Sequence, residues 1–130
     1  MNSSNQCILC IEDEAEMIDL IRIILSRKGL QVLGASGGEE GLRKIDEEKP
    51  DLVLLDLMMP DMDGWEVYQQ MKANEKTRDI PVIVVTAKAQ SIDKVLGLHI
   101  AKVDDYIAKP FSPEELLASV EKVLAKKKKA

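Results

Sequence analysis

Five polar residues that could do chemistry each follow a short apolar run of the chain. Three are carboxylates, one is a hydroxyl and one is an amine; in chain order they are Glu12, Asp13, Asp56, Thr86 and Lys109. Carboxylates that lie close together repel one another, so such a cluster is tolerable chiefly when a cation or a neighbouring Lys offsets the charge. The residue types therefore point to a site for a cation and a charged group, provided that the fold brings them together.

Mg²⁺ is the cation that suits this set, because it prefers hard oxygen ligands, takes few protein carboxylates and shares phosphate oxygens. A carboxylate can also attack phosphorus, and phosphoryl transfer needs mainly alignment and neutralisation of charge. Asp56 is the preferred nucleophile because its run lies centrally, while Glu12 and Asp13 can hold the metal. Thr86 and Lys109 can then neutralise the charge on the phosphoryl oxygens.

The elements that must position these residues are short apolar runs that alternate with segments of helical period. The runs cover residues 8–11, 30–33, 52–55, 82–85 and 106–108. The alternation is typical of a parallel sheet with helices on both faces. Short right-handed crossovers favour a doubly wound α/β domain with the flavodoxin-like strand order 2-1-3-4-5. In such sheets ligands bind beyond the carboxyl ends of the strands, between the first and third strands.

Each candidate residue also has an ordinary explanation when it is taken alone. Asp13 could cap a helix, and Asp56 could be a loop acid. Thr86 could bond to its own backbone, and Lys109 could be a solvated charge. The functional interpretation is favoured because four of the five strands deliver such a group to the same edge of one sheet.

Helix boundaries are also legible in the sequence. Ser36 with Glu39 and Ser112 with Glu115 have the spacing of capping boxes. Gly29 is the expected stop of the first helix. Apolar residues recur on one face of that helix, and the expected face consists of Met17, Leu20, Ile21, Ile24 and Leu25.

Composition limits the classes of function. The 130 residues are 45% hydrophobic, so we expect one domain over residues 1–130, with an ordered core over residues 6–125 and a frayed, basic tail at Lys126 to Lys129. The net charge of -5 argues against binding to nucleic acid or an anionic membrane. Because no apolar run could span a bilayer and no signal pattern opens the chain, we expect a cytoplasmic protein with protein partners.

Cys7 and Cys10 form a C-x-x-C motif, but neither a redox pair nor half a zinc site fits well. A strand sends residues three apart to opposite faces, and no second Cys or His pair follows. We expect buried, unreactive thiols.

Four segments carry a resemblance to a known family. They are 8–14 (ILCIEDE), 51–64 (DLVLLDLMMPDMDG), 81–87 (PVIVVTA) and 104–111 (DDYIAKPF). In order and spacing they resemble the CheY-like receiver domain of bacterial two-component response regulators, over nearly the whole chain.

The resemblance implies that Asp56 accepts a phosphoryl group from a sensor histidine kinase or a phosphotransfer protein. Lys109 and Thr86 would contact the phosphoryl oxygens, and the bond between Lys109 and Pro110 would be cis. The receiver would promote only its own phosphorylation and dephosphorylation, so we do not expect an enzyme. The implied ligands of Mg²⁺ are Glu12, Asp13, Asp56 and the Met58 carbonyl.

The resemblance also implies a switch. Thr86 would move toward the phosphoryl group and Tyr106 would turn inward, although an aromatic residue on a strand is more often part of a core than a switch. The face made by the fourth helix, fifth strand and fifth helix would then change its affinity for a downstream protein effector. A phosphorylation-dependent homodimer is a further expectation.

Two features differ from the family pattern, and a third concerns the lifetime of the phosphorylated state. Glu12 replaces the commoner Asp and adds one methylene, which should preserve metal binding. The segment 99–103 is one residue longer than usual and lacks the expected glycine. Met58 and Lys88 lie where a hydrolytic water would approach, so we hypothesise that they set the lifetime of the phosphorylated state.

Other functions compete with this interpretation. The first is an unphosphorylated protein-interaction module, a pseudo-receiver, which loss of Asp56, Thr86 or Lys109 would have supported. A metal-dependent phosphohydrolase would usually carry an acid where Met58 stands. A flavin carrier needs a phosphate-binding first loop, which the acids 12–14 would disfavour. With no second domain in the chain, we expect output by protein contact, from either a stand-alone receiver or a fragment.

Overall fold

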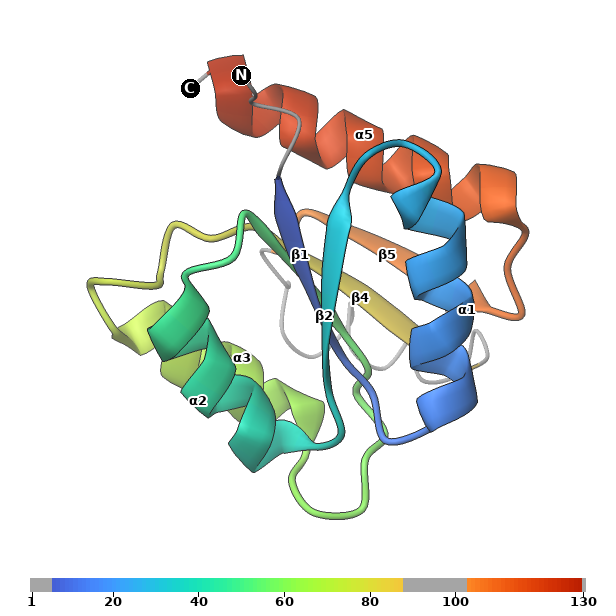
Figure 1. Ribbon diagram of the computed structural model, residues 1–130. Helices are drawn as coiled ribbons and strands as arrows, with labels where there is room; N and C mark the ends of the chain where they lie inside the picture. Colours follow the sequence, from blue (N-terminus) through green and yellow to red (C-terminus); the bar gives the residue numbers. More distant parts are fainter. Residues whose placement is uncertain (1–5, 88–102, 130) are drawn as a thin grey trace.

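A parallel sheet of five strands forms the centre of the molecule, in the order β2-β1-β3-β4-β5 (Figure 1). The computed structural model describes residues 6–87 and 103–129. Its strands are β1 (Cys7–Ile11), β2 (Gln31–Ala35), β3 (Leu52–Leu55), β4 (Val82–Ala87) and β5 (Asp105–Lys109). All four pairings are parallel, so the predicted fold class and strand order are confirmed.

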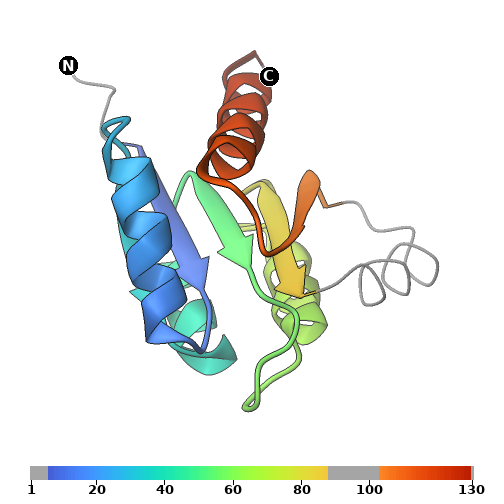
Figure 2. The ribbon, with the colours of Figure 1, turned by 90° about the vertical axis from the view of Figure 1, so that its right-hand side faces the viewer.

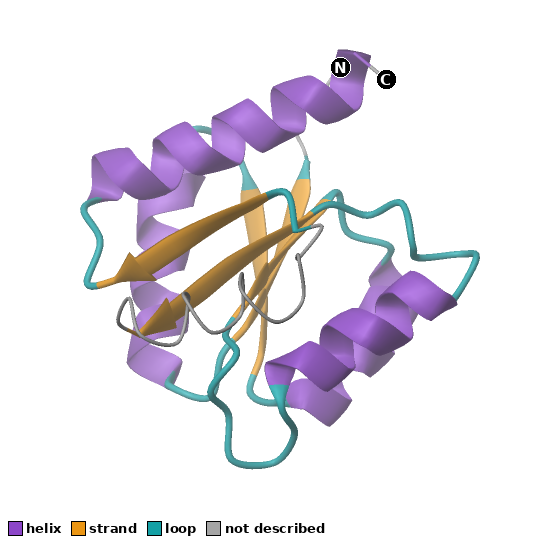
Figure 3. Ribbon diagram, turned by 180° about the vertical axis from the view of Figure 1, so that it is seen from behind, coloured by secondary structure: helices purple, strands orange, loops and turns teal. Residues whose placement is uncertain are grey.

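Helices cover both faces of the sheet, as Figure 3 shows. The described helices are α1 (Ala15–Ser26), α2 (Gly38–Glu48), α3 (Gly64–Ala73) and α5 (Pro113–Lys129). Residues of α1 and α5 pack in one core cluster, and residues of α2 and α3 pack in the other. Alternate residues of each central strand feed the two clusters, because successive strand side chains point to opposite faces.

The central strand β3 is the most completely buried part of the sheet. All four of its residues are at most 1% exposed. Burying one such Leu or Val side chain contributes about 1.5–3 kcal/mol. A continuous apolar run without alternation is therefore what a strand covered on both faces requires.

The ends of three strands differ from the prediction. β2 runs to Ala35 rather than to Leu33, because Gly34 and Ala35 pair with Cys10 and Ile11 in the ladder. β4 and β5 also extend further than their apolar runs, so Thr86 and Lys109 are paired strand residues and do not follow their strands. The end of a strand is set by hydrogen bonding to the neighbouring strand, and the apolar composition of the run alone does not reveal where that bonding stops.

Leu20 was predicted for the buried face of α1, and this was wrong. Leu20 is 44% exposed, whereas Ile18 is buried beside Ile21 and Leu25. The stripe that faces the sheet therefore passes through Ile18, three residues before Ile21, rather than through Leu20. A spacing of three or four residues fits several stripes on one helix, and only packing selects among them.

The two predicted capping boxes have different outcomes. Ser112 and Glu115 bond reciprocally at the start of α5, so that box is confirmed. The box at Ser36 and Glu39 was wrong, because Ser36 bonds to Glu40 instead. Gly29, with φ of 78°, follows α1 as the predicted stop.

At the chain end, α5 continues through Lys129, so the predicted basic tail is helical up to that residue; lysine is a good helix former and suits the negative end of a helix. The prediction of two buried cysteines was right for one of them. Cys10 is buried, and burial raises the pKa of its thiol to about 12, whereas Cys7 is only half-buried.

Among the described residues, no helix combines the length and the apolar character needed to cross a membrane.

Candidate functional site

The predicted site residues come together at the carboxyl edge of the sheet. The segment after β3, here called the β3–α3 loop (residues 56–63), extends beyond the ends of the strands in Figure 2. Glu12 and Asp13 follow the neighbouring strand β1. The backbone N–H of Asp56 donates to the Ile11 carbonyl at 3.1 Å, which continues the ladder and holds the two acidic segments side by side.

Three carboxylates form one cluster at this edge. One carboxylate oxygen from each of Glu12, Asp13 and Asp56 lies within 4.8 Å of the other two. Glu12 and Asp56 are only 2% and 4% exposed, while Asp13 is open to solvent. Two buried acids and one accessible acid make a donor set of hard oxygens that fits a divalent cation such as Mg²⁺.

Lys109 offsets part of the negative charge. Its Nζ lies 2.7 Å from Glu12 Oε1 and 3.5 Å from Asp56 Oδ2. Burial alone would lower the pKa of Lys109, but the hydrogen bond to Glu12 and the charge of Asp56 outweigh it and raise that pKa above its ordinary value. The amine is therefore a fixed positive charge beside Asp56.

Glu12 is the acid that the site perturbs most clearly. Burial raises the pKa of Glu12 to about 7, against the hydrogen bond from Lys109, and the charge of Asp56 adds to the rise. The backbone N–H of Glu14 donates to Oε2 of Glu12 at 3.3 Å. The longer Glu side chain thus reaches Lys109 and still presents an oxygen to the cluster.

Asp56 is held on both of its oxygens. The backbone N–H of Met58 donates to Oδ1 at 3.0 Å, and Oδ2 faces Lys109. The carboxylate therefore has a defined orientation beside a cation. Sequence reasoning named the carbonyl of Met58 but missed its N–H, since a bond between residues two apart depends on the path of the loop.

Thr86 lies at the same edge on β4 and is fully buried. Its hydroxyl has no hydrogen-bond partner among the residues that the structure describes. A buried hydroxyl without a partner costs roughly 1–3 kcal/mol, so it is found mainly where a function needs it.

The remaining predicted residues have separate outcomes. Tyr106 on β5 is 46% exposed, so it is not a core aromatic here. The bond between Lys109 and Pro110 is cis, as expected. The side chain of Met58 is exposed. Lys88, the fourth helix and most of the segment 99–103 lie outside the described residues.

Comparisons with known proteins agree with this geometry. The family model "Response regulator receiver domain" matches residues 8–121. The chain is 44% identical over 120 residues to the alkaline phosphatase synthesis transcriptional regulatory protein PhoP of Bacillus subtilis (strain 168), covering 92% of this chain and 49% of PhoP. It is 39% identical over 117 residues to the phosphate regulon transcriptional regulatory protein PhoB of Escherichia coli (strain K12), covering 90% and 51%. The chain thus spans about half the length of these curated relatives.

Solved structures give the same result. The crystal structure of a response regulator receiver domain protein (CheY-like) from Methanospirillum hungatei JF-1 matches with a TM-score of 0.85 and 32% identity, covering 96% of this chain and 98% of that one. The resemblance seen in the sequence and the strand order both agree with these matches. The chain belongs to the response regulator receiver domain family.

Proposed function

We propose that this receiver domain is a switch in which Asp56 accepts a phosphoryl group in a Mg²⁺-dependent reaction. One observation carries the proposal. Asp56 lies 3.5 Å from the amine of Lys109, and one of its oxygens lies within 4.8 Å of oxygens of two further carboxylates. A buried acid that faces both a cation and a metal-binding set has what phosphoryl transfer requires.

In the proposed reaction, a carboxylate oxygen of Asp56 forms a bond to the phosphorus of a phosphohistidine on a donor protein. The bond between phosphorus and nitrogen breaks, and its electron pair returns to the imidazole of the donor. Lys109 faces the attacked group and offsets the charge of its oxygens. Bound Mg²⁺ would neutralise the same charge, and its proposed ligands are Glu12, Asp13, Asp56 and the Met58 carbonyl.

Thr86 is the proposed sensor of the phosphoryl group. Its buried hydroxyl could gain a phosphoryl oxygen as partner, which would favour an arrangement that the unmodified domain populates less. Tyr106, exposed on the neighbouring strand, is the proposed second switch residue. We propose that the surface of β5 and α5 then changes its affinity for a protein effector or a second copy of the domain.

The donor is proposed to dock beside the acidic cluster. An open groove of about 450 Å³ lies at the start of α1, lined by Glu14, Ala15, Glu16, Met17 and Leu20. Exposed Leu20 gives a histidine kinase or phosphotransfer protein an apolar contact in this groove, which begins at the residue after Asp13. Within this proposal the domain works in the cytoplasm and promotes only its own phosphorylation and dephosphorylation, rather than acting as an enzyme on other molecules.

The test is intact-mass spectrometry after incubation with acetyl phosphate and Mg²⁺. We expect one phosphoryl adduct that is labile to hydroxylamine, is absent with EDTA and is absent from Asp56→Asn. Asp46→Asn, the same change at an exposed acid of α2, should keep the adduct. A folded native chain that binds Mg²⁺ but gains no adduct would instead favour the pseudo-receiver, the unphosphorylated interaction module.

A further inference from the structure

The β3–α3 loop is closed at its base by contact between backbones. The N–H of Gly64 donates to the Leu57 carbonyl at 3.1 Å. A Cβ added at Gly64 would lie 2.4 Å from the Asp56 carbonyl oxygen, so no larger residue fits without movement. This contact fixes where the loop returns to α3, but it does not constrain the outer end of the loop.

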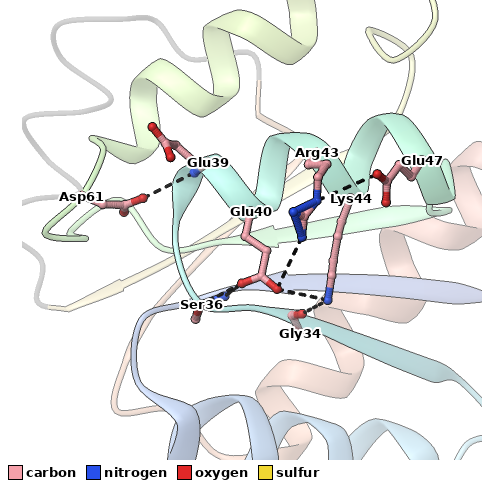
Figure 4. Close-up of polar contacts among 8 residues, drawn as sticks. All are labelled: Gly34, Ser36, Glu39, Glu40, Arg43, Lys44, Glu47 and Asp61. Atoms are coloured by element: carbon pink, nitrogen blue, oxygen red, sulfur yellow. Dashed lines mark hydrogen bonds and ion pairs between the residues drawn. The ribbon is translucent and has the colours of Figure 1, made fainter.

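Asp61, near the outer end of the loop, is bound by the N-terminus of α2. Its Oδ1 accepts from the Gly38 N–H at 3.1 Å, and its Oδ2 accepts from the Glu39 N–H at 3.4 Å. Figure 4 shows the carboxylate of Asp61 directed at the start of the helix. These backbone bonds, with that of Gly38 foremost, hold the pKa of Asp61 below its ordinary value.

The helix α2 depends on this bond because it has no side-chain cap of its own. Its N-cap residue is Gly37, and Ser36 is bonded to Glu40 (Figure 4). The first N–H groups of a helix lack partners within the helix. Asp61 supplies acceptors from 22 and 23 positions away in the sequence.

Two glycines let the loop and the helix approach each other. A Cβ added at Gly37 would lie 2.8 Å from Asp61 Oδ2, and one added at Gly38 would lie 2.7 Å from Met62 Cβ. Both distances are shorter than atoms of this kind tolerate. The pair of glycines on one segment and the pair Asp61 and Met62 on the other therefore fit together.

We propose that Asp61 is a positioning residue for phosphorylation, whose bonds to α2 hold the loop that orients Asp56 and the Met58 carbonyl. Met58 lies two residues after Asp56 and three before Asp61, and its N–H already binds Asp56. With the base and the outer end both held, the Met58 peptide has few orientations available. Without Asp61 the carbonyl spends less time where a metal ligand is needed, so metal binding weakens.

This inference rests on the proposed function, and it is tested by calorimetric titration of the whole chain with Mg²⁺ alone. For Asp61→Ala we expect the Mg²⁺ Kd to rise about tenfold, at the lower end of the loss seen for groups that orient metal ligands. For Asp61→Asn we expect a Kd within about threefold of the native value, because Asn caps a helix nearly as well as Asp. If Asp61 acted instead through the attraction of its negative charge for Mg²⁺, Asp61→Asn would raise the Mg²⁺ Kd as much as Asp61→Ala does.

A double variant separates positioning from simple stabilisation of α2. In Gly37→Ser/Asp61→Ala, the new Ser stands at the N-cap and the atoms that would meet its Cβ are gone. We expect urea unfolding to show restored stability, while the Mg²⁺ Kd stays raised because the loop remains unbound.

Three results would overturn the inference: an unchanged Kd in Asp61→Ala, an Asn variant that binds as weakly as the Ala variant, or a Kd restored in the double variant. A native chain that does not bind Mg²⁺ would contradict the proposed function itself, and the native titration reports this separately.

Discussion

At the scale of single residues, the ion pair between Glu12 and Lys109 largely sets the net charge of the site. Glu12 is buried between a positive amine and a second acid, and its contact with Lys109 at 2.7 Å is shorter than the contact of Lys109 with Asp56. The amine is therefore shared, and Glu12 receives the closer contact. Its protonation state decides how much negative charge the site offers to a cation.

Mg²⁺ affinity should consequently depend on pH near neutrality. Burial raises the pKa of Glu12 to about 7 in the metal-free protein, so below that pH a proton competes with the metal. The apparent Mg²⁺ Kd should rise about fivefold as the pH falls from 7 to 6. Titrations at pH 6, 7 and 8 would measure it. Glu12→Gln should bind more weakly with a flatter profile, whereas Glu16→Gln should keep the native profile.

Two buried threonines allow a matched test at the same scale. The Thr86 hydroxyl has no partner among the described residues, whereas the Thr77 hydroxyl donates to the Met71 carbonyl at 2.7 Å. We expect Thr86→Val to leave the free energy of unfolding unchanged or to raise it by about 1 kcal/mol. Thr77→Val should lower it by about 1–2 kcal/mol, since it leaves a hydrogen bond unmade. Equal losses of stability in urea unfolding would contradict the assignment of Thr86 as a residue whose hydroxyl has no partner within the described part of the unphosphorylated domain.

At the scale of elements, the helix starts are held in two different ways. α5 is capped by its own capping box, while α2 is capped by Asp61 from a distant loop. A local cap belongs to its helix alone. A cap supplied by another segment couples the helix to that segment, here the loop that carries Asp56.

This difference predicts that replacing Ser by Ala lowers the free energy of unfolding by unequal amounts at the two helix starts. Ser112→Ala should lower the free energy of unfolding by about 1 kcal/mol, because it removes the N-cap of α5. Ser36→Ala should cost less than about 0.5 kcal/mol, because its hydroxyl makes a solvent-exposed bond to the half-buried Glu40 and caps nothing. Urea unfolding of both variants measures the difference. A cost for Ser36→Ala as large as that of Ser112→Ala would show that the first capping box forms in solution.

The whole molecule brings residues from opposite ends of the chain to one edge. Lys109 and Glu12 are 97 positions apart in the sequence and in direct contact. Parallel pairing of all five strands is the cause, since it sends every carboxyl end the same way. The cluster therefore exists only in the folded chain, and any cation that it binds must stabilise the fold.

Mg²⁺ should accordingly raise the stability of the whole domain. At a free concentration of 100 times its Kd, the gain in free energy of unfolding should be about 2.7 kcal/mol. Asp13→Asn should remove most of this gain and also stabilise the metal-free fold, because one of three mutually repelling carboxylates is lost. Asp79→Asn, a change at an exposed acid that follows α3, should leave the gain intact. Urea unfolding with Mg²⁺ and with EDTA measures all three proteins.

The class of fold, the strand order and the polar residues at one edge of the sheet could all be predicted from the sequence. Those features depend on apolar runs, helical period and the order of elements, which are local properties of the chain. The matched family segments added the expected roles of Asp56 and Lys109. The cap at Ser112 was also predictable, since both partners lie within one helical turn.

The sharing of Lys109 between two acids, the buried stripe of α1 and the cap of α2 could not be predicted, because they depend on how the folded chain packs. Glu12 receives the closer contact of Lys109, Ile18 replaces Leu20, and Asp61 replaces Ser36. Each of these depends on a distance between segments that are far apart in the chain, or on which of several equally spaced faces meets the sheet. Local spacing cannot report such distances, because they are set by how the packed layers approach one another.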